Sequence, residues 1–278
     1  MTLFLNLRSQ SVGGGIVDPY LLEGSGTVNP PTLAAVPWAE IQGKVAGKDV
    51  LLGVHGFNVD YYRGAHSFGQ LDTYLGLANQ SEVFIGVLWP GDFWMPVVNY
   101  PFEGSDAMDC GRRLAAFCDR WFAGAQSISF VSHSLGARLV LEAVARLGRR
   151  ARMVCLMAGA INNDCLTAEY RSAAANSDTI FVLASRHDVV VRMAYQIGDP
   201  ISNILDHDHA FFQKALGYEG PPSPAAPPVA FPWQIQDDYA YGHGHYLPPT
   251  NPPVLSQRVG DYIRRAFRSE PQPRPGAL

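Results

Sequence analysis

The chain has 278 residues, enough for one large α/β domain without requiring a second. Its 21 Lys and Arg residues stand against 25 Asp and Glu residues, which gives a net charge of −4 with no long run of like charge. This balance disfavours a nucleic-acid-binding protein, because binding phosphate backbones requires a clustered excess of positive charge.

The sequence contains no apolar stretch long enough to span a membrane, and its N-terminus lacks the basic segment of a signal peptide. The four cysteines, Cys110, Cys118, Cys155 and Cys165, form no C-x-x-C pair. We expect them to be small buried side chains in a reduced compartment, and we favour the cytoplasm.

Apolar runs and helical periodicity alternate along most of the chain, but residues 9–47 are rich in Gly, Pro and Ser. We expect this segment to be a loop with a short helix near residues 38–41. Strands are expected at residues 2–8, where we place an edge strand, and at 49–55, 83–89, 127–132, 153–158 and 179–184; helices are expected at 64–77, 105–122, 134–147, near 208–216 and at 254–267.

This alternation predicts an α/β fold with a mostly parallel central sheet and helices on both faces. We expect one domain over residues 1–270 and a disordered tail at 271–278. Two irregular excursions, 92–104 and 195–241, are candidates for a cap or lid. Right-handed crossovers place the carboxyl ends of the strands along one edge of the sheet, where sites form.

The most informative motif is Ser132-His133-Ser134-Leu135-Gly136, which ends a strand pattern and opens a helix pattern. A serine at such a sharp turn has its hydroxyl pushed out of the sheet, and the backbone N–H of Leu135 points into the same space. The motif is G-x-S-x-G with Ser132 in place of the first glycine. We interpret Ser134 as a nucleophile, the alternative being a turn serine without a chemical role.

A serine nucleophile needs a base, and the base needs a carboxylate to orient it. Asp188 lies four residues after a predicted strand, in the loop where the hydrolase arrangement presents its acid. The alternatives for Asp188 are a solvated loop residue or the N-cap of a helix at 189–196. The competing carboxylates follow no strand as clearly; they are Asp164, Asp199, Asp206 and Asp208.

For the base, His243 and His245 both precede the last predicted helix. Donors for an oxyanion are expected from backbone N–H groups, those of Leu135 and of Phe57, which follows a buried strand and a His-Gly turn. Two other histidines, His55 and His133, are expected to be structural.

The run Asp206-His207-Asp208-His209 has the residue types of a metal site. Its alternation brings the two histidines together only in an extended chain, and no further ligands are evident nearby in the sequence. We expect neither a metal ion nor an organic cofactor.

Together these motifs resemble the α/β-hydrolase superfamily, and most closely a bacterial family of uncharacterised esterases and lipases. The family's motifs appear as HGFN at 55–58, LWPGD at 88–92 and SHSLG at 132–136. Its histidine motif, H-x-Y-F followed by N-P, appears as HYL…NP at 245–252 with the intervening residue missing. The offset to the proline and the closing helix selects His245 over His243. The resemblance covers about residues 49–267.

The resemblance implies hydrolysis of a small carboxylic ester through an acyl-enzyme, with Ser134, Asp188 and His245 as the triad and no cofactor. The N–H groups of Phe57 and Leu135 would form the oxyanion hole. A thioesterase, amidase, peptidase or acyltransferase would use the same triad, and a lipase at a membrane surface would need a lid in addition. A non-catalytic binding protein on this fold is the alternative from another class. A dehalogenase is disfavoured, because its nucleophile at this turn would be Asp. The oligomeric state is left open.

Overall fold

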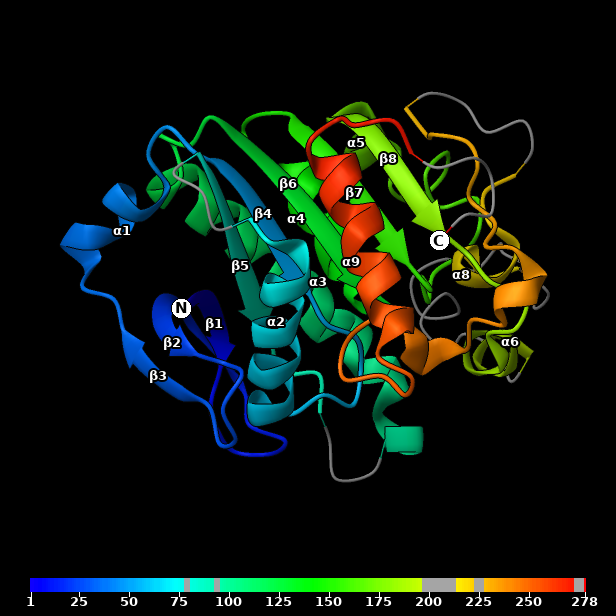
Figure 1. Ribbon diagram of the computed structural model, residues 1–278, viewed down its shortest axis with the longest axis horizontal. Coiled ribbons are helices and arrows are strands. Elements are labelled where there is room, and N and C mark those ends of the chain that lie inside the picture. Colours follow the sequence, from blue (N-terminus) through cyan, green and yellow to red (C-terminus); the bar gives the residue numbers. More distant parts are fainter. Residues whose placement is uncertain (78–80, 93–95, 197–213, 223–227, 273–277) are drawn as a thin grey trace.

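The computed structural model describes residues 1–77, 81–92, 96–196, 214–222, 228–272 and 278. Within them lies an eight-stranded sheet in the order β3-β2-β1-β5-β4-β6-β7-β8 (Figure 1). β1–β2 and β2–β3 pair antiparallel, and the other neighbours pair parallel. The strands are β1 (Thr2–Arg8), β2 (Ile16–Ser25), β3 (Thr32–Ala35), β4 (Asp49–Val54), β5 (Glu82–Leu88), β6 (Ser127–His133), β7 (Ala151–Met157) and β8 (Ser177–Leu183).

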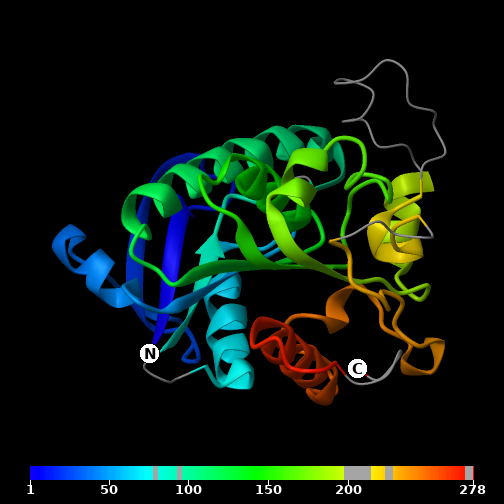
Figure 2. The same ribbon diagram turned by 90° about the horizontal axis from the view of Figure 1, so that it is seen from above.

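Helices cover both faces of this sheet (Figure 2). α2 and α9 lie side by side on one face, and α3 and α4 pack together on the other, with α5 beside α4. The helices are α1 (Trp38–Val45), α2 (Tyr61–Leu75), α3 (Pro96–Trp121), α4 (Gly136–Arg146), α5 (Arg171–Ala175), α6 (Val189–Gln196), α8 (Leu216–Glu219) and α9 (Val254–Phe267), with the 3-10 turns η1 (Asp237–Tyr239) and η2 (His243–His245). This is the α/β architecture that the sequence predicts.

Two apolar cores, one on each face, explain why the central strands are continuous apolar runs. Along β4, Leu52 packs into the core that includes α3 and α4, and its neighbour Leu51 into the core of α2 and α9. Successive side chains of a strand point to opposite faces, so a strand covered on both faces needs apolar residues at every position.

The prediction for the N-terminal region is wrong in two respects. Residues 9–47 contain the strands β2 and β3 as well as α1, which is longer than the predicted turn of helix. β1 is not an edge strand, since it lies between β2 and β5 and is buried along its whole length. Pro19 obscured the pattern of β2, because proline cannot donate to a strand ladder; it lies where the β1–β2 register shifts.

The excursion at 92–104 also differs from its prediction. α3 begins at Pro96, nine residues before the predicted helix start at 105. Proline suits a first helical position, whereas Pro101 and Gly104 weaken the helical pattern in the sequence. Residues 93–95 lie outside the described part, as do 208–213 of the helix expected near 208–216, most of the expected tail, and 197–213 and 223–227 of the second excursion.

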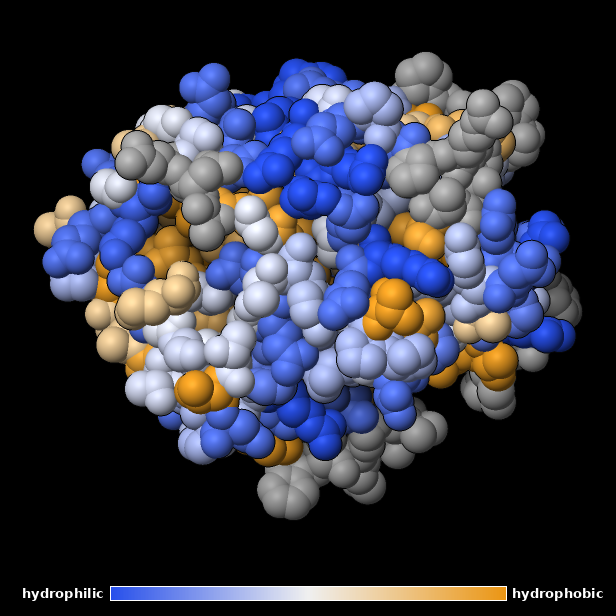
Figure 3. Space-filling view, viewed as in Figure 1, coloured by the Kyte–Doolittle hydropathy of each residue, from blue (hydrophilic) through white to orange (hydrophobic). Residues whose placement is uncertain are grey.

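The described end of the second excursion covers the outer edge of the sheet. Residues 228–235 run beside β8, with backbone bridges from Ile180 to Val229 and from Ala184 to Gln234. At the opposite end of the molecule, hydrophobic side chains reach the surface around α1 and β3 (Figure 3). No helix in the described part of the chain is long and apolar enough to cross a membrane.

Candidate active site

Ser134 occupies the turn between β6 and α4, in a left-handed backbone conformation with φ of 55°. Such a conformation costs a residue other than glycine about 1–2 kcal/mol, so the surroundings must impose it. The backbone N–H of Ser134 donates to Met157 at 3.0 Å, and its carbonyl accepts from Ala137 at 3.1 Å and Ala160 at 3.2 Å. The turn is therefore fixed by α4 and by the end of β7, with the Ser134 side chain at the carboxyl edge of the sheet.

Two glycines allow the chain segments around Ser134 to approach one another. A Cβ atom on Gly136 would lie 2.5 Å from the carbonyl oxygen of His55, at the end of β4. A Cβ atom on Gly56 would lie 2.8 Å from the Cβ atom of Ser134. The His-Gly turn after β4 therefore lies directly against the serine, as the sequence motifs predict for these two loops.

Asp188 follows β8 and is fully buried. Its Oδ1 accepts a hydrogen bond from the N–H of Val191 at 3.0 Å, in the first turn of α6, and its Oδ2 lies 2.8 Å from Nδ1 of His243. The N-cap and the partner of a histidine were alternative interpretations of this residue. Because the two contacts use different oxygens, Asp188 fills both positions.

The structure pairs Asp188 with His243, whereas the sequence motifs favour His245. Nδ1 of His245 instead accepts the N–H of Gly242 at 3.0 Å, within its own turn. Both histidines belong to η2, and a 3-10 helix has about three residues per turn, so side chains two positions apart point in different directions. The expected Asp188–His245 pairing is therefore replaced by Asp188–His243.

Two neutral histidines, His55 and His133, hold the loops around Ser134 and His243 by hydrogen bonds. The backbone N–H of Trp89 donates to Nε2 of His55 at 3.3 Å, and Nδ1 of His55 donates to the carbonyl of Gly56 at 2.9 Å. His133 lies 2.9 Å through its Nε2 from the carbonyl oxygen of His243. Burial lowers the pKa of each of these two imidazoles to about 3, which keeps both uncharged at neutral pH. These contacts agree with the expectation that both residues are structural.

A buried ion pair between Arg8 and Asp92, which no sequence motif predicts, holds the loop that contains Phe57. Arg8 and Asp92 are both buried and lie 2.6 Å apart. Arg8 also donates to the carbonyl oxygens of Val59 at 3.1 Å and Trp89 at 3.3 Å, and so joins the ends of β1 and β5 to the loop after β4. The only sequence signals were a charged residue at the end of an apolar strand and the Asp of LWPGD.

The two expected oxyanion donors lie on adjacent loops. Leu135 is the N-cap of α4, and among the described residues its N–H has no hydrogen-bond acceptor. Phe57 follows Gly56, the residue that contacts Ser134, and its side chain packs against the core beside α3 and α4. A helix N-terminus with unpaired N–H groups attracts negative charge.

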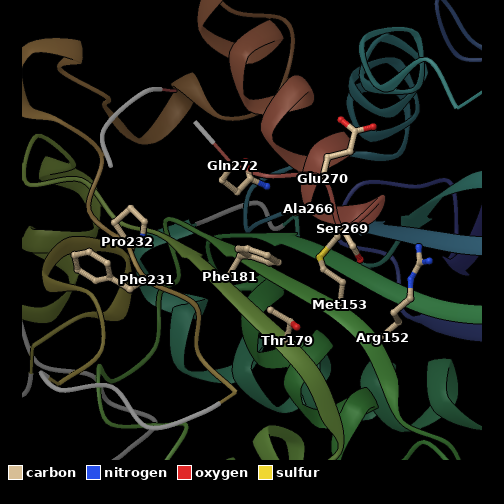
Figure 4. Close-up of a pocket in the computed structure, with 10 residues that line it drawn as sticks. All are labelled: Arg152, Met153, Thr179, Phe181, Phe231, Pro232, Ala266, Ser269, Glu270 and Gln272. Atoms are coloured by element: carbon tan, nitrogen blue, oxygen red, sulfur yellow. The ribbon is translucent and has the colours of Figure 1, made fainter. Parts of the chain in front are cut away.

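A cavity of about 610 Å³ lies away from these residues (Figure 4). Its lining includes Met153 and Thr179, near the beginnings of β7 and β8, whereas Ser134 and Asp188 follow the ends of β6 and β8. The other lining residues are Arg152, Phe181, Phe231, Pro232, Ala266, Ser269, Glu270 and Gln272. None of the candidate site residues lines this cavity, so it is not the place where Ser134 would meet a substrate.

The remaining candidates from the sequence are the run with metal-ligand residue types and the four cysteines. Asp206 to His209, the run with metal-ligand residue types, lies outside the described part of the chain, as does Asp199. Within the described residues, no group of three or more His, Cys, Asp or Glu side chains is placed to hold a metal ion. The four cysteines are buried, as expected, and burial raises the pKa of the Cys155 thiol to about 12.

The mostly parallel sheet, the serine at its strand-to-helix turn and the buried acid–histidine pair are the features of an α/β hydrolase. The model of the family described as alpha/beta hydrolase of unknown function (DUF900) matches residues 38–215, well over half of the chain, and the protein belongs to this family. The matched residues include Phe57, Ser134 and Asp188, whereas His243 and His245 lie beyond them. No curated protein matches the sequence.

Proposed function

We propose that this protein is a serine hydrolase that cleaves small carboxylic esters, with Ser134 as the nucleophile, His243 as the base and Asp188 as the orienting acid. The observation that carries the proposal is the 2.8 Å contact between the buried Asp188 and His243, on the same edge of the sheet as the left-handed Ser134. His133, next to Ser134 in the chain, contacts the His243 backbone and so links the serine turn to the histidine loop.

The hydrogen bonding sets the role of each nitrogen of His243. Carboxylate oxygens accept, so Nδ1 of His243 carries the proton that it donates to Asp188, and the neutral ring has its lone pair at Nε2. Nε2 is therefore the atom able to take the proton of the Ser134 hydroxyl as its oxygen attacks the ester carbonyl. Asp188 then stabilises the imidazolium that forms.

The remaining steps follow from the same residues. The oxyanion of the tetrahedral intermediate would accept hydrogen bonds from the N–H groups of Leu135 and Phe57, each worth about 3–4 kcal/mol to the transition state. Collapse breaks the ester C–O bond, and His243 returns its proton to the departing alcohol. Water, deprotonated by His243, attacks the acyl-Ser134 ester, and the carboxylic acid leaves as the serine regains its proton.

The test is hydrolysis of p-nitrophenyl esters from acetate to decanoate, together with labelling by a fluorophosphonate, in the wild type and in Ser134→Ala. We expect turnover and labelling in the wild type and neither in the variant. Equal rates in both proteins would remove Ser134 as the nucleophile. Acyl thioesters and anilides, assayed in parallel, would show whether the triad prefers another acyl bond. No turnover on any of these and no labelling of the wild type would favour a binding protein.

A further inference from the structure

The ring of His133 contacts both the backbone and the ring of His243, the candidate base. Nε2 of His133 lies 2.9 Å from the carbonyl oxygen of His243, and the two imidazole rings have centroids 4.6 Å apart with planes inclined by 45°. A carbonyl oxygen only accepts hydrogen bonds, so Nε2 of His133 carries the proton and donates it. This is a hydrogen bond between residues 110 positions apart in the chain.

The same ring also borders the turn that precedes Phe57. A Cβ atom on Gly56 would lie 3.1 Å from Nδ1 of His133, so this nitrogen faces the His-Gly turn after β4. His133 therefore lies where three loops meet, namely the turn that holds Ser134, the turn at Gly56 and the loop of His243. Each loop supplies one part of the proposed site. His133 precedes the proposed nucleophile in the chain, and its ring contacts the other two loops, those of Gly56 and His243.

His133 and two of the side chains near it, His55 and Tyr246, are uncharged at neutral pH. Burial is the main cause that lowers the pKa of His133 to about 3, and His243 beside it lowers it further. His55 is neutral for the same reason of burial, and burial raises the pKa of the Tyr246 hydroxyl, whose ring lies 5.8 Å from that of His133. An imidazolium on His243 would thus meet no positive charge from this side, whereas a protonated His133 would repel it.

We propose that His133 is a positioning residue, whose Nε2–H donates to the His243 carbonyl and thereby holds the His243 ring between Asp188 and Ser134. The inference rests on the proposed function, because it assumes that His243 is the base. The donor, and not ring packing alone, fixes the loop, since the bond to the carbonyl sets the backbone position from which the side chain extends. Displacing a catalytic group by about 1 Å typically lowers the rate about a hundredfold.

Two variants separate the donor from the ring. His133→Gln keeps an N–H donor at a similar reach and loses the ring, and His133→Phe keeps a ring of similar size and loses the donor. We expect His133→Phe to lower kcat about 10- to 100-fold with little change in KM, and His133→Gln to retain most of the activity. A proton NMR spectrum should show the downfield Nδ1–H resonance of His243 in the wild type and the Gln variant, but broadened by water exchange in the Phe variant.

The outcomes distinguish this inference from the proposed function. Fluorophosphonate labelling of Ser134 in the wild type tests the proposed function and is measured first. If labelling and turnover are present and His133→Phe has wild-type kcat and a sharp resonance, the positioning role is wrong. Activity in the Phe variant with loss in the Gln variant would assign the effect to packing and overturn the inference as well. Circular dichroism checks folding, and His133→Met, also without a donor, replaces the Phe variant if that one does not fold.

Discussion

The buried carboxylate of Asp188 lies 2.8 Å from Nδ1 of His243, a residue 55 positions further along the chain. The other oxygen of the carboxylate accepts the N–H of Val191, so the start of α6 also fixes its position. This relationship decides which histidine is the candidate base.

Replacing the two histidines of η2 should give very different results. His243→Ala removes the proposed base and should lower kcat/KM for an ester by at least about a thousandfold. His245→Ala removes only the hydrogen bond that His245 accepts from Gly242, and we expect an effect below about tenfold. Steady-state kinetics on the best p-nitrophenyl ester measures both. A large loss in the His245 variant with an active His243 variant would return the base to His245.

Substitutions of Asp188 should separate activity from stability, since its two oxygens have different partners. Asp188→Asn preserves an oxygen to cap α6 but would no longer stabilise the imidazolium of the proposed triad, and activity should fall by about four orders of magnitude, as the corresponding substitution does in a serine protease. Asp188→Ala loses the cap as well and should cost about 1 kcal/mol more in the free energy of unfolding. Urea titrations and kinetics of the two variants check this, and equal activity of Asp188→Asn and the wild type would contradict the triad.

Gly56 should tolerate no side chain. In Gly56→Ala the new methyl group would lie 2.8 Å from the Cβ atom of Ser134 and 3.1 Å from Nδ1 of His133, so one of the loops must move. We expect a loss of kcat of about a hundredfold or more, because both the nucleophile and the Phe57 amide are displaced. Gly244→Ala is the matched control, as a Cβ atom there meets nothing within 4 Å. Similar kinetics for the two variants would show that the approach of the loops is unimportant.

Removing one partner of the buried Arg8–Asp92 pair should be costly. Arg8→Met leaves the Asp92 carboxylate buried without its partner and should lower the free energy of unfolding by about 3–5 kcal/mol. Arg63→Met removes the partner of Asp60 in an exposed pair at the start of α2 and should cost less than about 1 kcal/mol. Urea denaturation followed by tryptophan fluorescence compares them, and equal losses would be inconsistent with burial as the cause.

Acid should destabilise the protein before its carboxylates titrate. The pKa of His55 and His133 is about 3 in the folded protein against an ordinary value of 6.5, so the unfolded chain takes up protons that the folded one does not. Their contribution to stability is present above pH 6.5 and is lost as the pH falls from 6.5 towards 3, at up to about 1.4 kcal/mol per pH unit for each group. Unfolding free energies between pH 7 and 5 test this.

Substitution of His133 provides the control for this pH dependence. His133→Gln should have a shallower decline in stability between pH 7 and 5, because one of the two buried titrating rings is removed. The matched variant is His187→Gln, which replaces an exposed histidine in the loop after β8. A decline as steep in His133→Gln as in the wild type would mean that this ring takes up its proton in the folded state.

The sequence predicted those parts of the site that depend on neighbouring residues. A strand pattern followed at once by small residues and a helix pattern placed Ser134 at a strand-to-helix turn, and the end of an apolar strand placed Asp188 in the loop after that strand, and the structure has both residues at these positions. For the candidate base, the sequence motifs favour His245, whereas the structure pairs Asp188 with His243. Its choice depends on how η2 turns and on which ring meets Asp188, and neither leaves a local pattern in the sequence.

By itself, then, the sequence determined the strands β4 to β8 with their helices and the serine turn, because period, strand length and turn residues are local properties of the chain. Only the tertiary structure decided that β1 lies inside the sheet, that Arg8 meets Asp92, and that His243 rather than His245 faces Asp188. These are contacts between residues far apart in the chain. They form only where packing brings the loops together, and the free energy of burial and hydrogen bonding selects among side chains that the sequence presents as equivalent.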